Sequence, residues 1–480
     1  MIPGVPIDLS PAAPDPSAPL AATAAPAARV AEHTLSALGV FHSYVWVFLV
    51  SFGVALCATP LMRRLAVRHG IVDRPNEARK QHKMPIAYLG GAAVFLGVIA
   101  GIFFSYLGDP DPTLGDLAIT RFGEPLQAVP FSIVLGMVVI AIVGLIDDVA
   151  GTTPRVKIGG QLFAAAALAF DNVGVKLAAG LLVPIADALG LPITTISDPF
   201  IGTDFRTLIY FIPLPFEVLG YSQIPIDIVY WVGTALIAFF VIGACNASNL
   251  IDGLDGLLSG VTAVATAGLL VVALALAVTG DGPRDGQRIV LCMAVLGACL
   301  GFLPHNFNPA SIFLGDCGSL LLGYCTIVII LTLGDTGKTH LVAAGLIIYS
   351  IPLIDTALAI VRRKMAGKSI SSADSDHLHH MLKRALGVKG AALSLYGFGA
   401  AFATLGVLMT FWRQRVVYAI TAVLLSYIAV IAIKVARKKQ IEEQALALDA
   451  PPSVPPPEAA PPLAVPETQA GTAAAGGVST

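Results

Sequence analysis

Long apolar runs without charge recur along the whole chain. A helix needs about 20 mostly apolar residues to cross a bilayer. The charge-free runs occupy 43–62, 88–107, 129–146, 228–245, 256–280, 289–304, 317–334, 390–412 and 416–433. A further run at 341–361 is interrupted only by Asp355, and a weaker run covers 157–170, with a continuation to about 187 left open. The pattern predicts an all-α polytopic membrane protein with about eleven transmembrane helices.

Basic residues are concentrated in three of the segments that connect these runs. Seven Lys and Arg residues lie at 63–83, seven at 362–389 and four at 434–439. With eleven spans these segments all fall on one side of the membrane. Because Lys and Arg accumulate in cytoplasmic loops, that side is predicted to be cytoplasmic, with the N-terminus outside and the C-terminus inside.

The segments outside the apolar runs divide the chain into three parts. Pro- and Ala-rich composition predicts disordered tails at 1–40 and 438–480, on either side of a transmembrane domain at 41–437. The longest connection, 171–227, is expected outside and contains the β-like runs LPITTI and TLIYFIPLPF. No function follows from that loop.

Composition supports the membrane assignment and excludes one class of partner. Hydrophobic residues make up 56% of the chain and charged residues only 12%, against about 25% charged residues in soluble domains. The formal net charge is −2, so no nucleic-acid surface is indicated.

Five polar clusters interrupt the apolar pattern, and with eleven spans all of them fall on the cytoplasmic side. The first, DRPNEARKQHKMPIAYLGG at 73–91, places cations before a glycine-rich helix start. Backbone N–H groups and the helix dipole at such a start favour a phosphate. An ordinary positively charged loop is the alternative. The substrate-binding candidates are Arg79, Lys80, His82 and Lys83.

Acidic residues dominate the next two clusters. Asp147 and Asp148, in GLIDDVAG, lie at a helix end beside lipid, where carboxylates are costly unless they hold a cation or a proton. A helix-end anchor in the headgroup region is the alternative. In NASNLIDGLDGLLSG, Asn246, Asn249 and Asp252 are three positions apart and share one helix face, and Asp255 follows where glycines break the helix. These side chains suit a nucleobase, a ribose or a hydrated metal, and a purely structural role is the alternative.

The last two clusters combine glycine, acid and histidine. In HNFNPASIFLGDCGSLLLG, Asp316 lies between glycines that leave room for a metal, and Phe313 could stack on a base; an N-cap in a tight turn is the alternative. SDHLHHMLKR offers His377, His379 and His380. The neighbouring bases favour an anion there over zinc or a bland loop. Carboxylates without thiolates favour Mg²⁺, with Mn²⁺ also suitable.

The five elements, in this order across about 45–435, resemble the polyprenyl-phosphate N-acetylhexosamine-1-phosphate transferase superfamily (glycosyltransferase family 4). The pattern at 73–85 and HxHH at 377–380 look like its N-acetylglucosamine-1-phosphate branch, since Leu378 interrupts the three consecutive histidines usual in the phospho-MurNAc-pentapeptide branch. The resemblance implies a bacterial inner-membrane enzyme with a cytoplasmic Mg²⁺ site. It would transfer N-acetylhexosamine-1-phosphate from a UDP-N-acetylhexosamine to undecaprenyl phosphate and release UMP, and dimers occur in such a family.

The resemblance also implies roles at matching positions. Asp147 and Asp148 look like the catalytic pair and Asp316 like the Mg²⁺ ligand, with the pair and Asn249 as further metal candidates. Two departures are Cys317, where Thr is more usual, and the long 171–227 loop. The residues matching the uridine, diphosphate and basic positions are Lys157, Asn246, Asn249, Asp252, Asp255, Asn306, Phe313, His377, His379 and His380.

The hypothetical mechanism is attack of the lipid phosphate oxygen on the sugar-linked phosphorus. A direct displacement is simpler than a covalent aspartyl route, and the sequence leaves both open. Because Asp147, Asp148 and Asp355 could also line an ion path, an ion-coupled transporter is the alternative class. Asp355 has no assigned catalytic role, and a structural bond to a neighbouring helix is expected for it.

Overall fold

The computed structural model describes residues 37–73, 85–107, 129–197, 204–218, 221–279, 284–365, 367 and 377–449. The four substrate-binding candidates Arg79, Lys80, His82 and Lys83 lie outside these segments, as do most of both predicted tails.

The described chain is almost entirely helical, as the apolar runs predict. Each predicted span coincides with a helix or, at 341–361, with a pair of helices. Eight helices of the described part are long and apolar enough to cross a membrane, and the pair α11–α12 would make a ninth. The protein is therefore an all-α polytopic membrane protein, while the count of eleven and the orientation stay predictions. The helices are α1 (Ala37–Arg68), α2 (Gly90–Leu107), α4 (Phe131–Ala150), α5 (Pro154–Phe170), α6 (Lys176–Ala188), α7 (Ile228–Ile251), α8 (Leu257–Thr279), α9 (Asp285–Asn306), α10 (Gly315–Thr332), α11 (Thr339–Ile348), α12 (Ser350–Met365), α13 (Leu378–Thr410) and α14 (Gln414–Asp449).

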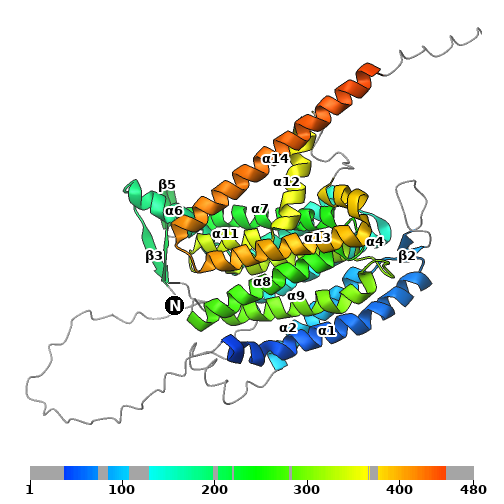
Figure 1. Ribbon diagram of the computed structural model, residues 1–480. Helices are drawn as coiled ribbons and strands as arrows, with labels where there is room; N and C mark the ends of the chain where they lie inside the picture. The colour runs from blue at the N-terminus through cyan, green and yellow to red at the C-terminus, as the bar shows by residue number, and fades with distance from the viewer. Residues whose placement is uncertain are drawn as a thin grey trace, which may run out of the picture.

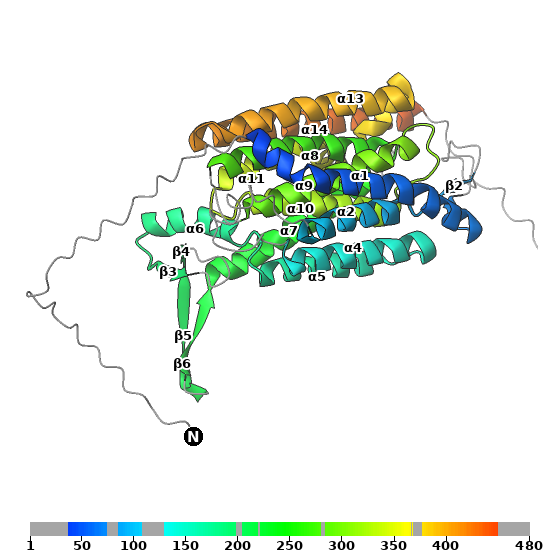
Figure 2. The ribbon, with the colours of Figure 1, turned by 90° about the horizontal axis from the view of Figure 1, so that it is seen from below.

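Helix α10 forms the centre of the bundle. Every residue from Cys317 to Thr332 is buried, because α2, α4, α7, α8 and α9 pack around it. A helix that is apolar on all sides has no face for solvent or lipid and belongs in such a position. The neighbouring helices run side by side along one direction (Figure 2), so their ends gather at the two ends of the bundle.

The predicted span at 341–361 is broken into two helices. Helices α11 and α12 meet at 81° around Tyr349. Pro352, in the first turn of α12, has no N–H to bond back to the last residue of α11, which explains why the helix does not continue straight. In Figure 1, α12 stands steeply across the direction of the other helices. The break brings Asp355 of α12 to the beginning of α13.

The segment 171–227 forms a separate small structure at one end of the bundle. Helix α5 ends at Phe170, and Asn172 and Gly174 have positive φ, so the chain turns instead of continuing the fourth span to 187. Two antiparallel hairpins follow α6, in the regions of the predicted β-like runs, and β5–β6 projects away from the helices (Figure 2). The strands are β3 (Thr194–Ser197) with β4 (Asp204–Thr207), and β5 (Ile209–Val218) with β6 (Tyr221–Asp227).

Helical structure extends beyond both ends of the predicted transmembrane domain, while the candidate spans Tyr44–Arg68 and Gln414–Ile431 lie within it. Helix α1 begins at Ala37, and α14 continues to Asp449 through residues assigned to the disordered tail. The segment 438–449, KKQIEEQALALD, consists mainly of strong helix formers and contains neither Gly nor Pro, so nothing in it ends the helix.

Candidate active site

A cavity of about 780 Å³ opens where the end of α7, the end of α9 and the beginnings of α10 and α13 meet. Residues of four of the five polar clusters line this cavity. The remaining cluster, at 147–148, does not line it but contacts Asp316 on its wall. The wall also includes the short strand pair β1 (Val72–Asp73) and β2 (Ile86–Ala87) through Asp73 and Ile86. Its polar and aromatic lining residues are Arg63, Asp73, Tyr88, Asn249, Asp252, Asp255, Asn306, Asn308, Ser311, Phe313, Asp316, His380 and Lys383.

Lys157 joins two of the predicted catalytic acids. Its Nζ lies 2.8 Å from Asp147 Oδ2 and also contacts Asp316 Oδ2. The chain turns between α4 and α5 through Gly151, and Pro154 then begins α5, which places Lys157 in the first turn opposite Asp147. Thr152 completes the turn, with its N–H and Oγ1 donating to Asp147 Oδ1 at 2.8 and 2.6 Å. Asp147 is therefore held in place while it faces Asp316.

The second oxygen of Asp316 is held by an amide. Asn249 Nδ2 donates to Asp316 Oδ1 at 2.9 Å and to Ser319 Oγ at 3.0 Å. The side chain of Asp316 is 24% exposed, so it is open to the cavity on one side. The carboxylate and amide oxygens of this pair are hard donors of the kind that Mg²⁺ and Mn²⁺ prefer.

Asp148 has a different task from Asp147. Its two oxygens accept hydrogen bonds from the backbone N–H groups of Asp316, at 2.7 Å, and Cys317, at 3.0 Å, so it satisfies the N-terminus of α10. Gly315 has φ +71°, and a Cβ there would lie 2.6 Å from an Asp148 oxygen. The structure thus separates the predicted pair: Asp147 faces Lys157, and Asp148 positions the backbone of Asp316.

Asp252 adds an acid without a paired cation. It caps the C-terminus of α7 on the cavity wall, and within the described segments its carboxylate has no hydrogen bond. Burial raises the pKa of Asp252 well above its usual range, and Asp316, Asp148 and Asp255 raise it further. A carboxyl group of this kind binds either a proton or a cation.

Asp255 and Asn306 hold the two loops of the cavity together. Asp255 Oδ2 accepts from Asn308 Nδ2 at 2.9 Å and from Ala310 N at 3.0 Å. Asn306 Oδ1 accepts from Gly256 N at 3.1 Å, and its Nδ2 donates to Ile312 O at 3.1 Å. Asn306 is only 4% exposed. Asn306 therefore bridges the two loops; because it also lines the cavity, its binding of substrate stays a prediction.

Two aromatic rings form one side of the cavity. Tyr88 and Phe313 meet edge to face with centroids 5.9 Å apart. Backbone bonds from Phe313 N to Ala87 O and from Gly90 N to Phe313 O fix them, at 2.8 and 3.0 Å. Burial, followed by the charge of Asp73, raises the pKa of Tyr88 to about 12, so its hydroxyl keeps its proton. Phe313 lines the cavity, and its stacking on a base stays a prediction; the sequence reasoning missed Tyr88.

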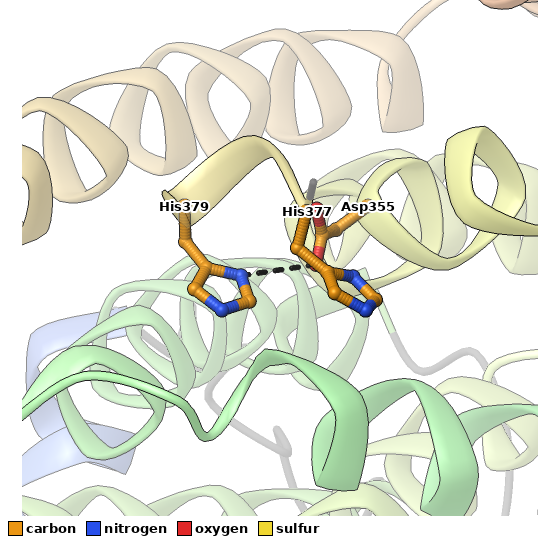
Figure 3. Close-up of side chains that lie close together, drawn as sticks. All are labelled: Asp355, His377 and His379. Carbon is orange, nitrogen blue, oxygen red and sulfur yellow. Dashed lines mark hydrogen bonds and ion pairs between the residues drawn. The ribbon is translucent and has the colours of Figure 1, made fainter. Parts of the chain in front are cut away.

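Only one of the three candidate histidines lines the cavity. His380 lies on its wall beside Lys383, whereas His377 and His379 point toward Asp355 on α12 (Figure 3). The hydrogen bonds from Asp355 to the beginning of α13 confirm the expected structural bond. No spacing along the chain signals that contact, because the α11–α12 break creates it.

Asn246 lies away from the cavity wall. Its Nδ2 donates to Gln161 Oε1 at 3.0 Å and to Ile242 O at 2.8 Å, which ties α7 to α5. The sequence reasoning placed Asn246 with the substrate-binding residues and missed Arg63, which does line the cavity. Arg63 follows the first apolar run directly, and basic residues at such a position are usual in any cytoplasmic loop, so its signal was not specific.

Comparison with known proteins identifies related sequences. The family model described as "Glycosyl transferase family 4" matches residues 130–334. The chain is 29% identical to a probable undecaprenyl-phosphate N-acetylglucosaminyl 1-phosphate transferase of Bacillus subtilis, over 80% of this chain and 90% of the relative. It is 32% identical to the decaprenyl-phosphate N-acetylglucosaminephosphotransferase of Mycolicibacterium smegmatis, over 72% and 78%. It is 27% identical to the phospho-N-acetylmuramoyl-pentapeptide-transferase of Bacillus anthracis, over 76% and 96%.

Proposed function

Because the chain belongs to glycosyl transferase family 4, we propose that it transfers N-acetylglucosamine-1-phosphate from its UDP-sugar to undecaprenyl phosphate and releases UMP. The observation that carries this proposal is the contact of Lys157 with both Asp147 and Asp316, of which Asp316 lines the cavity. It places a cation and two acids where the phosphates of a nucleotide sugar and of a lipid could meet.

The nucleoside end of the substrate fits the aromatic part of the cavity wall. The rings of Tyr88 and Phe313 offer an apolar wall for a base, and aromatic stacking of a base contributes about 1–3 kcal/mol. Asp255 keeps one oxygen that no hydrogen bond of the described residues engages, which suits an N–H or O–H donor of uridine. His380, Lys383 and Arg63 supply cations or donors for phosphate oxygens.

A divalent cation, Mg²⁺ or Mn²⁺, fits the oxygen donors around Asp316. Asp316 and Asn249 are in contact, and Asp252 adds an acid without a partner among the described side chains. When bound, such an ion offsets negative charge on the diphosphate. Asp148 is the least suited of the four predicted metal-binding residues, because both its oxygens are engaged by the backbone of α10.

Side chains of the protein itself can position the reacting phosphate groups. Asp147 and Asp316 hold Lys157, whose ammonium group can donate to a phosphate oxygen and stabilise charge that develops as the sugar-linked phosphorus is attacked. Asp148 keeps the beginning of α10, and with it Asp316, at a constant distance from α4. This arrangement is compatible with a direct displacement by the lipid phosphate.

We place the enzyme in the bacterial inner membrane with the cavity on the cytoplasmic side. The basic segments at 63–83 and 362–389 adjoin cavity-lining residues, and cytoplasmic loops are rich in Lys and Arg. A nucleotide sugar is also made and supplied in the cytoplasm. A single-cysteine labelling experiment in intact cells would test the orientation; accessibility of Lys383→Cys from outside would contradict it.

A substrate assay tests the function. Membranes containing the chain, incubated with radiolabelled UDP-GlcNAc, Mg²⁺ and undecaprenyl phosphate, are expected to yield lipid-soluble label and UMP in equal amounts. The phospho-MurNAc-pentapeptide alternative is not favoured, since the relatives with that name are less similar to the chain. Label from UDP-MurNAc-pentapeptide but not from UDP-GlcNAc would reverse that conclusion, and label transported without UMP release would indicate a carrier.

A further inference from the structure

Three groups at the beginning of α13 converge on one buried carboxylate of α12. Asp355 Oδ2 lies 3.0 Å from His377 Nδ1 and 3.2 Å from His379 Nδ1, and Oδ1 accepts from Leu378 N at 2.6 Å (Figure 3). Asp355 and His379 are each 1% exposed. A carboxylate that is ionised can only accept, so each Nδ1 must carry its proton, and the unprotonated nitrogen of each neutral ring is then Nε2.

The position of His379 connects Asp355 to the cavity. A Cβ on Gly253 would lie 2.7 Å from His379 Nε2, so this nitrogen lies against the loop that carries Asp252 and Asp255. On its other side, the His379 ring lies 4.3 Å from that of His380, centroid to centroid. His379 therefore touches both a cavity loop and a cavity-lining histidine, while it lines no part of the cavity itself.

We propose that Asp355 is a positioning residue of the active site, which sets the tautomers of His377 and His379 and thereby holds His380 and the 252–255 loop in place. This proposal rests on the proposed transferase activity. Asp355 is too far inside the protein to touch substrate, so its effect passes through the histidines. A carboxylate that orients an imidazole in this way influences turnover without entering the reaction.

The first test replaces the carboxylate by its isosteric amide. Asp355→Asn keeps the size of the side chain but places an NH₂ donor where an acceptor is needed. We expect kcat/KM to fall about 10- to 100-fold, as when the partner of a functional histidine is removed. The matched control is Asp335→Asn, which removes another buried carboxylate, 6% exposed, at the opposite end of the bundle. Measured per folded molecule, it should retain activity within about twofold because the sites are distant.

The second test separates the two nitrogens of His379. The amide nitrogen of Asn is close to the position of Nδ1, and that of Gln is close to Nε2. If the bond to Asp355 is what matters, His379→Asn retains most activity and His379→Gln loses about as much as Asp355→Asn. The opposite order would overturn the proposal, as would Asp355→Asn with wild-type turnover.

A third readout does not depend on activity. ¹⁵N spectra of histidine-labelled protein should show Nδ1–H tautomers for His377 and His379, and a shift toward Nε2–H in Asp355→Asn. A wild type that transfers no sugar phosphate can still differ from Asp355→Asn in its spectra in this way. In that case the proposed function fails and the tautomer assignment stands. The same three side chains are close enough to share a metal ion. One tightly bound zinc per chain that is lost in Asp355→Asn would overturn the proposal.

Discussion

The two ends of the helix bundle use the same kinds of charged residue in opposite ways. At the end away from the cavity, Arg284 pairs with Asp335 at 2.5 Å and Arg288 with Asp285 at 2.8 Å. All four are at most 6% exposed. Arg288 Nε also donates to Thr332 O at 3.1 Å, and Gly174 N donates to Asp335 Oδ1 at 3.0 Å. In this network of described residues, two cations therefore balance two anions.

Among the residues that the structure describes, the acids at the cavity end outnumber the cations that touch them. Asp147 and Asp316 share Lys157, Asp148 accepts from two backbone N–H groups, and Asp252 has no hydrogen bond from the described residues. Buried charge is costly unless it is paired. The balanced end is therefore built for stability, and the unbalanced end stores electrostatic energy that a bound cation or a proton can relieve.

The largest expected effect is the loss of activity in Asp316→Asn. The amide removes the negative charge that contacts Lys157 and weakens any cation site, so turnover should fall about 10³-fold, as when a main electrostatic group is removed. Transfer of label from UDP-GlcNAc to lipid measures it. The protein should still insert in the membrane, because Asp316 lies beside the cavity and not within the packed core. Near wild-type turnover would contradict the role of Asp316.

Asp335→Asn tests the opposite end. It leaves Arg284 buried without its ion-pair partner, which should cost about 3–5 kcal/mol in the free energy of unfolding. Thermal unfolding in detergent measures the loss, and activity per folded molecule measures its separation from function. An undiminished melting temperature would show that the network at this end does not stabilise the bundle.

Phe313→Ala should weaken substrate binding more than turnover. Removing one of the two aromatic rings is expected to raise KM for the UDP-sugar about tenfold, in line with about 1.4 kcal/mol of stacking. Phe307→Ala, on the loop that follows α9, is a suitable control because Phe307 does not line the cavity. Inhibition by UMP should weaken in parallel. An unchanged inhibition constant would show that the uracil base does not stack on Phe313.

The smallest expected effect is a gain in the free energy of unfolding, in contrast to the losses predicted above. Asp252→Asn removes an acid whose pKa is raised, so in metal-free protein at neutral pH it should stabilise by about 1 kcal/mol while it lowers activity. Because the pKa of Asp252 is raised in the folded protein, folding favours its protonated form. Below the ordinary Asp pKa this residue therefore costs no stability, and the free energy of unfolding falls as pH rises through the pKa of the folded state. The advantage of Asp252→Asn should therefore disappear as pH falls toward 4, as chelator-treated unfolding curves at several pH values can check.

Much of the fold could be predicted because lipid imposes a simple rule on sequence. Each apolar run of sufficient length became a helix, because unpaired backbone groups are too costly in a membrane. The break at Tyr349 was not predicted, whereas the end of α5 at Phe170 was one of the two alternatives left open. The chain stays largely apolar around Tyr349, so hydropathy carries no sign of that break.

Several residues that meet at the cavity were among the sequence candidates, but their division of labour could not be predicted. The order and chemistry of the five clusters already brought Asp147, Asp316, Asn249 and Phe313 together as candidates, since residues at the same ends of antiparallel spans must meet. Which of two adjacent acids faces Lys157, which amide bridges helices, and which carboxylate holds the histidines depend on helix rotation and on the bend between α11 and α12. Those are set by side-chain packing among segments far apart in the chain, and only the tertiary structure decides them.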